Sequence, residues 1–124
     1  MAAPMAVLAV LAAGCNEQPQ APSIPTFDTP QLQQGRATWM QVCRNCHLRG
    51  VAGAPAIDDY AAWESRTDEG REPLYRSAID GIADATGWRM PPRGGNDALS
   101  DDEVRRAVDF MLAAVQHGRD ATSE

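Results

Sequence analysis

Apolar residues recur at intervals of three and four positions in the C-terminal third of the chain. Such spacing places side chains on one face of a helix. Ser100 and Glu103 precede the run as a capping box would, and Gly118 follows it where a helix commonly ends. The pattern therefore predicts an amphipathic helix that ends before Gly118. Its apolar face consists of Val104, Ala107, Val108, Met111, Leu112 and Val115.

Three shorter helices are predicted upstream. Thr29 and Pro30 form a start signal, a capping hydroxyl followed by proline at the first helical position. A short helical piece is expected around 58–64, and Pro73 lies in the first turn of another helix. The residues expected on one face of each helix are Leu32, Gly35, Trp39 and Val42 in the first, Tyr60 and Trp63 in the second, and Leu74, Ala78, Ile79 and Ile82 in the third.

Two segments rich in glycine and proline separate these helices. Residues 48–57 and residues 84–97 both have the composition of loops. No segment alternates between apolar and polar residues as a half-buried strand would. The predicted fold class is therefore all-α, with long ordered loops.

The first fifteen residues, MAAPMAVLAVLAAGC, differ from the rest. The apolar run from Ala6 to Ala13 is too short to span a bilayer but fits the apolar region of a secretory signal. Small residues before Cys15 resemble a bacterial lipobox, although leucine stands one position too early, at Leu11. We expect a lipoprotein signal peptide at 1–14 and a lipid on Cys15. The alternative is an ordinary cleaved signal with an incidental cysteine.

Four of the nine prolines lie in residues 16–30, which otherwise lack a periodic apolar pattern. This composition is typical of an extended linker. We therefore expect an anchor and linker at 15–30, a folded domain at 31–118 and a flexible tail at 119–124. Without a lipid on Cys15, the same segment is a plain disordered N-terminus.

Charge and cysteine content exclude several classes of protein. The 124 residues favour one small domain, whose own apolar core is thin and would gain from a large buried cofactor. Seventeen acidic residues against eleven basic ones, a net charge of −6, argue against a nucleic-acid binder and against a polybasic membrane segment. Three cysteines are too few for a disulfide scaffold.

Cys43, Cys46 and His47 form the sequence C-x-x-C-H, which attaches c-type haem. Two thiols three residues apart lie on one side of a helical turn and match the two vinyl groups on one porphyrin edge. The next residue can point its imidazole at the iron. An iron with histidine on one side needs a sixth ligand or stays open to small molecules.

Met90, in a loop of glycine and proline, is the candidate sixth ligand. Pro91 and Pro92 hold the chain extended around it. Ligation by histidine and methionine saturates the iron, raises its potential and suits electron transfer. His117 is a second candidate, but it lies near a helix end, where a surface cation is common.

Two other interpretations of the cysteines were weighed. A redox-active dithiol normally lies within a βαβ pattern, which this sequence lacks. A zinc site built from Cys43, Cys46, His47 and His117 has poorly fitting spacing.

The segments CHLRGVAGAP (46–55) and MPPRGGNDALSDDEVRRAVDFM (90–111) resemble class I monohaem cytochromes c, and in particular the cytochrome c-five subgroup. The resemblance spans about 31–117 and implies four to five helices around one covalently bound haem c. It implies thioether links to Cys43 and Cys46 and axial ligation by His47 and Met90. The carbonyl of Pro55 would accept the Nδ1 hydrogen of His47.

The resemblance also implies a helix crossing, in which Gly35 and Trp39 meet the last helix near Phe110. The chain departs from some members of the subgroup because it has no second cysteine pair outside the haem motif. Its lipobox and linker lie outside the common core and suggest a tethered variant.

The loops expected around the haem carry an unbalanced charge. Residues 43–57 and 85–96 hold Arg44, Arg49, Arg89 and Arg93 and no acid, which leaves −10 for the rest of the chain. This distribution predicts a charge dipole that orients an acidic redox partner. The arginines could instead pair with haem propionates. Trp88 is expected to pack on the haem or line its rim.

Together these features predict a one-electron carrier of a bacterial periplasmic respiratory chain, tethered to a membrane by lipid and without substrate turnover of its own. One alternative is a haem enzyme or sensor whose Met90 dissociates. Another is a haem subunit of a larger oxidase or dehydrogenase.

Overall fold

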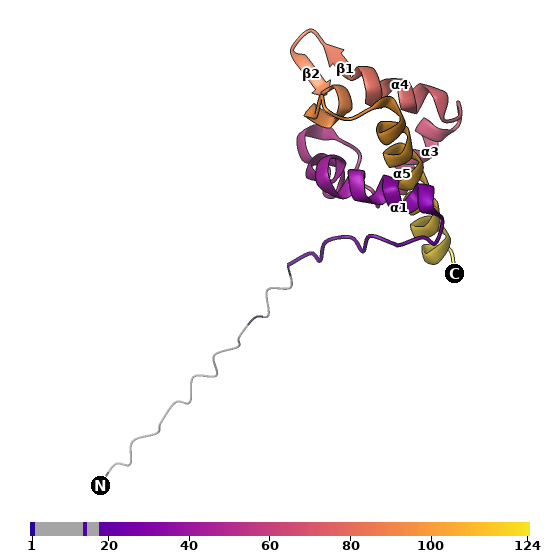
Figure 1. The fold of residues 1–124 in the computed structure, drawn as a ribbon. Helices are drawn as coiled ribbons and strands as arrows, with labels where there is room; N and C mark the ends of the chain where they lie inside the picture. Colours follow the sequence, from indigo (N-terminus) through magenta and orange to yellow (C-terminus); the bar gives the residue numbers. More distant parts are fainter. Residues whose placement is uncertain (2–13, 15–17) are drawn as a thin grey trace.

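The computed structural model describes Met1, Gly14 and residues 18–124 (Figure 1). Cys15 and residues 2–13 of the predicted signal lie outside the described residues. The fold is mostly helical, as predicted. In chain order the elements are α1 (Pro30–Thr38), the π-helix η1 (Trp39–Cys43), α2 (Arg44–His47), the 3₁₀ turn η2 (Val51–Gly53), α3 (Tyr60–Thr67), α4 (Glu72–Asp80), β1 (Ile82–Asp84), β2 (Gly87–Met90), the 3₁₀ turn η3 (Pro92–Gly95) and α5 (Asp101–Thr122).

The predicted helix starts are confirmed, although the hydroxyl of Thr29, expected to cap the first helix, makes no capping hydrogen bond. α1 begins at Pro30, and α4 carries Pro73 in its first turn. The carboxylate of Asp59 caps α3 by accepting from the amide of Ala62. Ser100 and Glu103 cap α5 reciprocally, as a capping box requires. Side-chain caps therefore mark where α3 and α5 begin, and a proline in the first turn marks the starts of α1 and α4.

α1 crosses α5 at a glycine, and this pair makes the most extensive helix–helix contact among the described residues (Figure 1). A Cβ atom on Gly35 would lie 2.0 Å from the carbonyl oxygen of Arg106. One turn later, Trp39 packs on Phe110 with ring centroids 5.8 Å apart, and both side chains are fully buried. The helix crossing implied by the resemblance is confirmed. It fixes the helical stretch that runs on into the C-x-x-C-H sequence.

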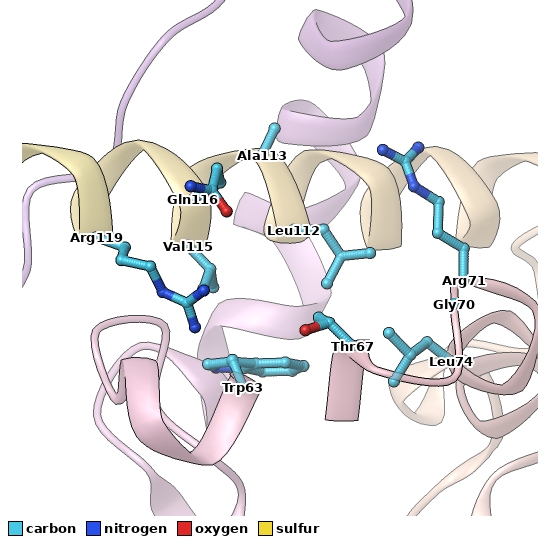
Figure 2. Close-up of a pocket in the computed structure, with 10 residues that line it drawn as sticks. All are labelled: Trp63, Thr67, Gly70, Arg71, Leu74, Leu112, Ala113, Val115, Gln116 and Arg119. Carbon is cyan, nitrogen blue, oxygen red and sulfur yellow. The ribbon is translucent and has the colours of Figure 1, made fainter. Parts of the chain in front are cut away.

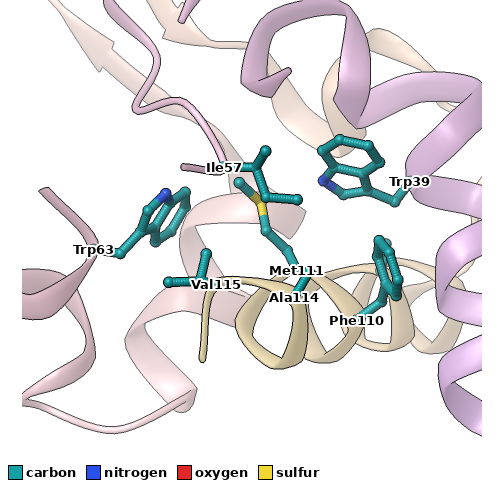
Figure 3. Close-up of a cluster of buried hydrophobic side chains, with 8 residues drawn as sticks. Trp39, Ile57, Trp63, Phe110, Met111, Ala114 and Val115 are labelled. Carbon is teal, nitrogen blue, oxygen red and sulfur yellow. The ribbon is translucent and has the colours of Figure 1, made fainter. Parts of the chain in front are cut away.

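The main core lies between α5, α3 and the start of η1, and Figure 3 shows its side chains. Trp39 and Trp63 are both buried there. The indole of Trp63 donates to the carbonyl of Ala56 at 2.7 Å, which ties α3 to the loop before it. The complete cluster is Trp39, Ile57, Trp63, Ala107, Phe110, Met111, Ala114 and Val115.

The segment before α1 packs on the domain, where an extended linker was predicted. Ile24 and Phe27 are half-buried against the core. Phe27 meets Phe110 edge to face at 6.0 Å, and Arg36 donates to the carbonyl of Pro25 at 3.0 Å. Isolated apolar residues without a period carry no helix or strand signal, so only tertiary packing reveals that the folded unit begins near Ile24.

α5 continues to Thr122, so the predicted end before Gly118 is wrong, and the expected tail begins with helix. Gly118 lies under the ring of Tyr60, where a Cβ atom would be 2.3 Å from the phenolic oxygen. Glycine at this position permits close packing inside the helix and does not terminate it. Among the described residues, no helix has the length and apolar character needed to cross a membrane.

An antiparallel hairpin of β1 and β2, which the all-α prediction missed, leads into the predicted loop at 84–97. Ile82 was predicted on the face of the preceding helix, but α4 ends at Asp80 and Ile82 lies in β1. The turn of the hairpin is built locally, because Asp84 accepts hydrogen bonds from both the amide and the hydroxyl of Thr86. Gly87 follows with φ +124°, a conformation that favours glycine. The hairpin leads directly into Met90.

Candidate haem-binding site

A cavity of about 400 Å³ lies between η1, α2, the loop after α2, α3, α4, α5 and residues 87–95, here called the Met90 loop, which comprise β2 and η3. The lining includes Cys43, Cys46, His47 and Met90, the four residues predicted to bind haem. Most of the rest of the lining is apolar, from both tryptophans in the core to Leu112 of α5. The fold thus brings the two parts of the predicted site, 43 positions apart in sequence, to one cavity.

Both cysteines lie in the helical stretch that continues from α1. A π-helical segment, Trp39–Cys43, precedes α2 and turns the face presented by Cys43 relative to α1. Such insertions in helices often mark functional sites. Cys43 and Cys46 are half-buried free thiols. Burial raises the pKa of Cys43 to about 11, so its thiol is protonated at neutral pH. Redox-active dithiols need a lowered pKa, so this environment disfavours the dithiol interpretation.

His47 is held in one orientation from several sides. Its Nδ1 lies 2.9 Å from the carbonyl oxygen of Pro55, and because a carbonyl can only accept, Nδ1 carries the hydrogen. The contact that the resemblance implied is therefore present. The amide of Ile57 donates to the carbonyl of His47 at 2.7 Å, and the ring of Trp63 lies 5.9 Å from the imidazole.

Burial lowers the pKa of His47, while the bond to Pro55 opposes this and the charge of Arg66 adds to it. A lowered pKa keeps the imidazole neutral. With Nδ1 occupied as a donor, Nε2 has a free lone pair, which is what a metal ligand requires.

Backbone strain is concentrated at this cavity. Ala52 and Arg93 are the two residues other than glycine with positive φ in the described chain, both at φ 55°. Ala52 belongs to the loop on the His47 side and Arg93 to the loop on the Met90 side, and both line the cavity. Such conformations cost of order 1–3 kcal/mol each and cluster where function demands a fixed loop shape.

The Met90 loop is anchored to three elements. Gly81, at the end of α4, has φ +80°, and a Cβ atom there would lie 2.8 Å from the carbonyl oxygen of Met90. Gly94 packs on the side chain of Val42 in η1. Arg93 bonds to Asp101 of α5 at 2.6 Å. The thioether of Met90 therefore comes from a braced loop.

The residues present fit a c-type haem. Two thiols, a neutral imidazole and a thioether line one mostly apolar cavity. Trp39 also lines the cavity. Its buried indole nitrogen has no hydrogen-bond partner among the described residues. A buried donor without a partner is costly, and a cofactor that carries acceptor groups can supply one.

The four arginines predicted to flank the haem differ in their surroundings. Arg93 is mostly buried and neutralised by Asp101. Arg89 is 66% exposed and lies 3.7 Å from Asp84. Arg44 is half-buried and Arg49 exposed, and neither forms an ion pair with a described residue. Sequence windows that contain no acid could not reveal Asp84 and Asp101 as partners.

Two further residues stand out at the site. Trp88 on β2 is 60% exposed and does not line the cavity, although it was expected to pack on the haem or its rim. Arg66 of α3 lines the cavity but was not predicted. No local motif distinguishes Arg66 from the other arginines, and only the packing of α3 places it there.

A second cavity, of about 460 Å³, lies between α3, α4 and α5 (Figure 2). Trp63, Leu74 and Leu112 line both cavities. Arg71 and Arg119 border this second cavity but bond to Asp109 and to the Tyr60 carbonyl. It is lined by no cysteine, histidine or methionine among the described residues, so it does not fit the attachment of haem.

Comparisons with known proteins agree with this geometry. Residues 30–111 match the family model described as cytochrome c oxidase, cbb3-type, subunit III. Cytochrome c-555 of Chlorobaculum tepidum is 40% identical over 78 residues, which cover 63% of this chain and 71% of the relative. Cytochrome c5 of Ectopseudomonas mendocina is 44% identical over 71 residues, which cover 56% and 76%.

A solved structure is also similar. It is a chain in the crystal structure of an electron transfer complex of nitrite reductase with cytochrome c. The TM-score is 0.58 at 34% sequence identity, and the match covers 66% of this chain and 94% of that chain. The family match, the relatives and the fold lead to one conclusion: this chain belongs to the monohaem class I cytochromes c, electron-transfer proteins with covalently bound haem c.

Proposed function

We propose that Cys43 and Cys46 form the thioether links to haem c and that His47 and Met90 are its axial ligands. The observation that carries this assignment is the single cavity lined by all four side chains. The haem iron supplies the one-electron couple. The protein supplies the ligands, an apolar surrounding and a fixed geometry, which are the features that tune a haem potential.

Each side chain has a defined task in this proposal. Pro55 holds Nδ1 of His47, so Nε2 is the nitrogen available to iron. The thioether of Met90 would serve as the second protein ligand and keep small molecules from the iron. Because the loops on both sides are braced, the ligands need to move little between redox states, which suits a carrier more than an enzyme.

The proposed location is the periplasmic face of a bacterial membrane, with Cys15 as the lipid anchor. The support is the apolar run at 6–13 and the small residues before Cys15. Because the folded unit begins near Ile24, the chain between Cys15 and Ile24 could span at most about 30 Å. The haem would then work close to the membrane surface.

The proposed partners are redox proteins of the respiratory chain with an acidic docking surface. The similar solved structure is an electron transfer complex of nitrite reductase with cytochrome c, which makes an enzyme of that kind a sensible first partner to test. Of the four arginines predicted to flank the haem, Arg93 is neutralised by Asp101. The basic groups left for a partner are Arg44, Arg49 and Arg89. Their attraction would act mainly on the rate of encounter.

A second candidate function is that of a haem subunit bound permanently in a larger oxidase. The family model that matches residues 30–111 is named after such a subunit, which is the observation in its favour. Isolation of the native protein separates the two functions. A carrier should purify without stoichiometric partner subunits, and an oxidase subunit should not.

The proposed carrier function is tested with the holoprotein made in cells that mature c-type cytochromes. The purified protein should take up and release one electron per haem reversibly, and its oxidised form should show the weak far-red band of sulfur bound to iron. Rapid binding of carbon monoxide or cyanide by the wild-type protein, with no far-red band, would instead favour an open-iron enzyme or sensor.

A further inference from the structure

A short segment before α1 belongs to the folded unit, although the family match begins only at Pro30. This segment, residues 24–28, is here called the strap. Ile24 and Phe27 pack against the core, and the ring of Phe27 meets that of Phe110 edge to face at 6.0 Å. The strap is therefore an addition to the matched domain, and its packing fixes it to α5.

The strap lies toward the opposite end of α5 from the Met90 loop. Phe27 also meets His117 edge to face at 6.1 Å. The Met90 loop is tied to the first residue of α5, because Arg93 bonds to Asp101 at 2.6 Å. His117 follows Asp101 by sixteen positions, which is about 24 Å along a helix. Figure 1 shows the same arrangement, with the hairpin of β1 and β2 projecting at one end of the domain and the chain before α1 running along the other.

The hairpin end carries exposed groups that suit a redox partner. Trp88 is 60% exposed and the side chain of Arg89 is 66% exposed. Both directly precede Met90, the proposed iron ligand, in β2. An exposed indole beside a cation fits a partner whose apolar contact is bordered by carboxylates. The hairpin end is therefore the end that such a partner has to reach.

The strap shortens the chain between the proposed anchor and the domain. From Cys15 to Ile24 the chain extends at most about 30 Å, whereas from Cys15 to Pro30 it would extend about 50 Å if the strap were free. To bring the hairpin to the bilayer, the domain must invert and lift the strap at least about 24 Å from the surface. With the strap docked, this inversion takes most of the available length and costs the linker most of its conformational freedom.

We propose that the strap orients the tethered domain with its hairpin end away from the membrane, so that the partner docking there is a water-soluble redox protein. A redox centre held at the bilayer surface would be out of reach of this end. The inference rests on the haem site and on the lipid anchor at Cys15 proposed above, and it does not depend on the identity of any partner.

The test measures electron transfer to the ferric haem of the holoprotein on phosphatidylcholine vesicles after a flash of light. The reductant is ruthenium tris-bipyridyl, whose excited Ru(II) gives one electron to the ferric iron and becomes Ru(III). This complex is either attached to a lipid headgroup, which holds it at the bilayer surface, or dissolved in the water. The yield of ferrous haem per flash is read from the transient absorbance.

The holoprotein of the full chain is used as it is isolated from cells. Protein that carries no lipid is coupled through the thiol of Cys15 to a maleimide lipid in the same vesicles. Failure of the native lipid anchor is therefore seen separately, as protein that needs this coupling in order to sediment with vesicles, and it does not decide the test of orientation.

Two variants give the hairpin end access to the bilayer. Ile24→Ser with Phe27→Ser frees the strap. Six glycine and serine residues inserted after Gln20, which is exposed, lengthen the linker by about 20 Å and leave the domain untouched, so the proposal stays testable if the double variant matures poorly. Thr26→Ala is the matched control, because Thr26 is an exposed residue of the strap.

We expect the yield with lipid-held ruthenium to be about fivefold higher in both variants than in the wild type and in Thr26→Ala, since a tethered group that cannot span the distance to its target has almost no effective concentration there. With dissolved ruthenium, all four proteins should give the same yield. Equal yields from the wild type and the insertion variant with lipid-held ruthenium would overturn the proposal.

A change of the same size with dissolved ruthenium would also overturn the proposal, because the strap would then act on the haem site and not on the orientation of the domain. Neither measurement uses a redox partner, so failure here is distinct from failure of the carrier function.

Discussion

Replacing Gly35 by alanine tests whether the crossing of α1 and α5 supports the haem site. Alanine is the better helix former by about 1 kcal/mol, so at an exposed position the change would stabilise the protein. Here the new Cβ atom would lie 2.0 Å from the carbonyl oxygen of Arg106 and 3.0 Å from Cβ of Phe110. A backbone carbonyl cannot rotate away as a side chain can, so the helices must separate.

Overpacking of this kind costs about 3 kcal/mol, at the upper end of its usual range. Subtracting the gain in helix propensity leaves a net loss of about 2 kcal/mol. For a domain of this size the melting temperature should fall by about 10 °C.

The assay is thermal unfolding of the holoprotein followed by circular dichroism. Ala37→Gly is the control, because Ala37 is exposed on the same helix and its replacement should cost only about 1 kcal/mol, through helix propensity. The reasoning predicts that Gly35→Ala is the more destabilised variant even though it has the better helix former. A Gly35→Ala protein as stable as the wild type, or more stable, would refute the close crossing as a determinant of the fold.

Three other predictions concern function. Met90→Ala should give a folded haem protein with a lower potential and new reactivity toward carbon monoxide, and survival of the far-red band in this variant would mean that another side chain ligates the iron. Cys15→Ser should move the haem protein from the membrane fraction to the soluble periplasm or leave its signal uncleaved, whereas a freely soluble wild-type protein with an unmodified mature N-terminus would exclude the lipid. Electron transfer to an identified partner should slow as the salt concentration rises. The double variant Arg49→Glu, Arg89→Glu should slow electron transfer further at low salt only. Trp88→Ala should slow it at every salt concentration, because the exposed indole offers an uncharged contact. Stopped-flow rates that do not depend on salt in the wild type would remove the basis for the arginine docking surface.

Local signals in the sequence were sufficient for the features that depend on neighbouring residues. Pro30 lies in the first turn of α1, and Ser100 and Glu103 cap α5 through contacts within three positions. The C-x-x-C-H spacing places both thiols on one side of a single helical turn, so local helix geometry was enough to interpret it. These features were predicted correctly because tertiary packing agrees with the local preference.

Features that depend on distant residues were missed or misassigned. The strands at Ile82–Asp84 and Gly87–Met90 are too short to show alternation. Glycine is common at helix ends, which is why an end was predicted before Gly118. In the structure Gly118 lies inside α5, where it allows the ring of Tyr60 to pack closely on the helix. The charge of Arg93 is cancelled by Asp101, in a different element. A sequence lists charges and glycines, and only the packing shows which neighbour each one meets.

The most direct test of the central claim is the intact mass of the denatured protein. Covalent attachment through both Cys43 and Cys46 predicts a single species whose mass equals the mature polypeptide plus one haem, and haem should stay with the protein after extraction with acid organic solvent. Cys43→Ala and Cys46→Ala should each largely abolish maturation. A wild-type protein with the mass of the bare polypeptide, whose haem extracts completely, would contradict the account.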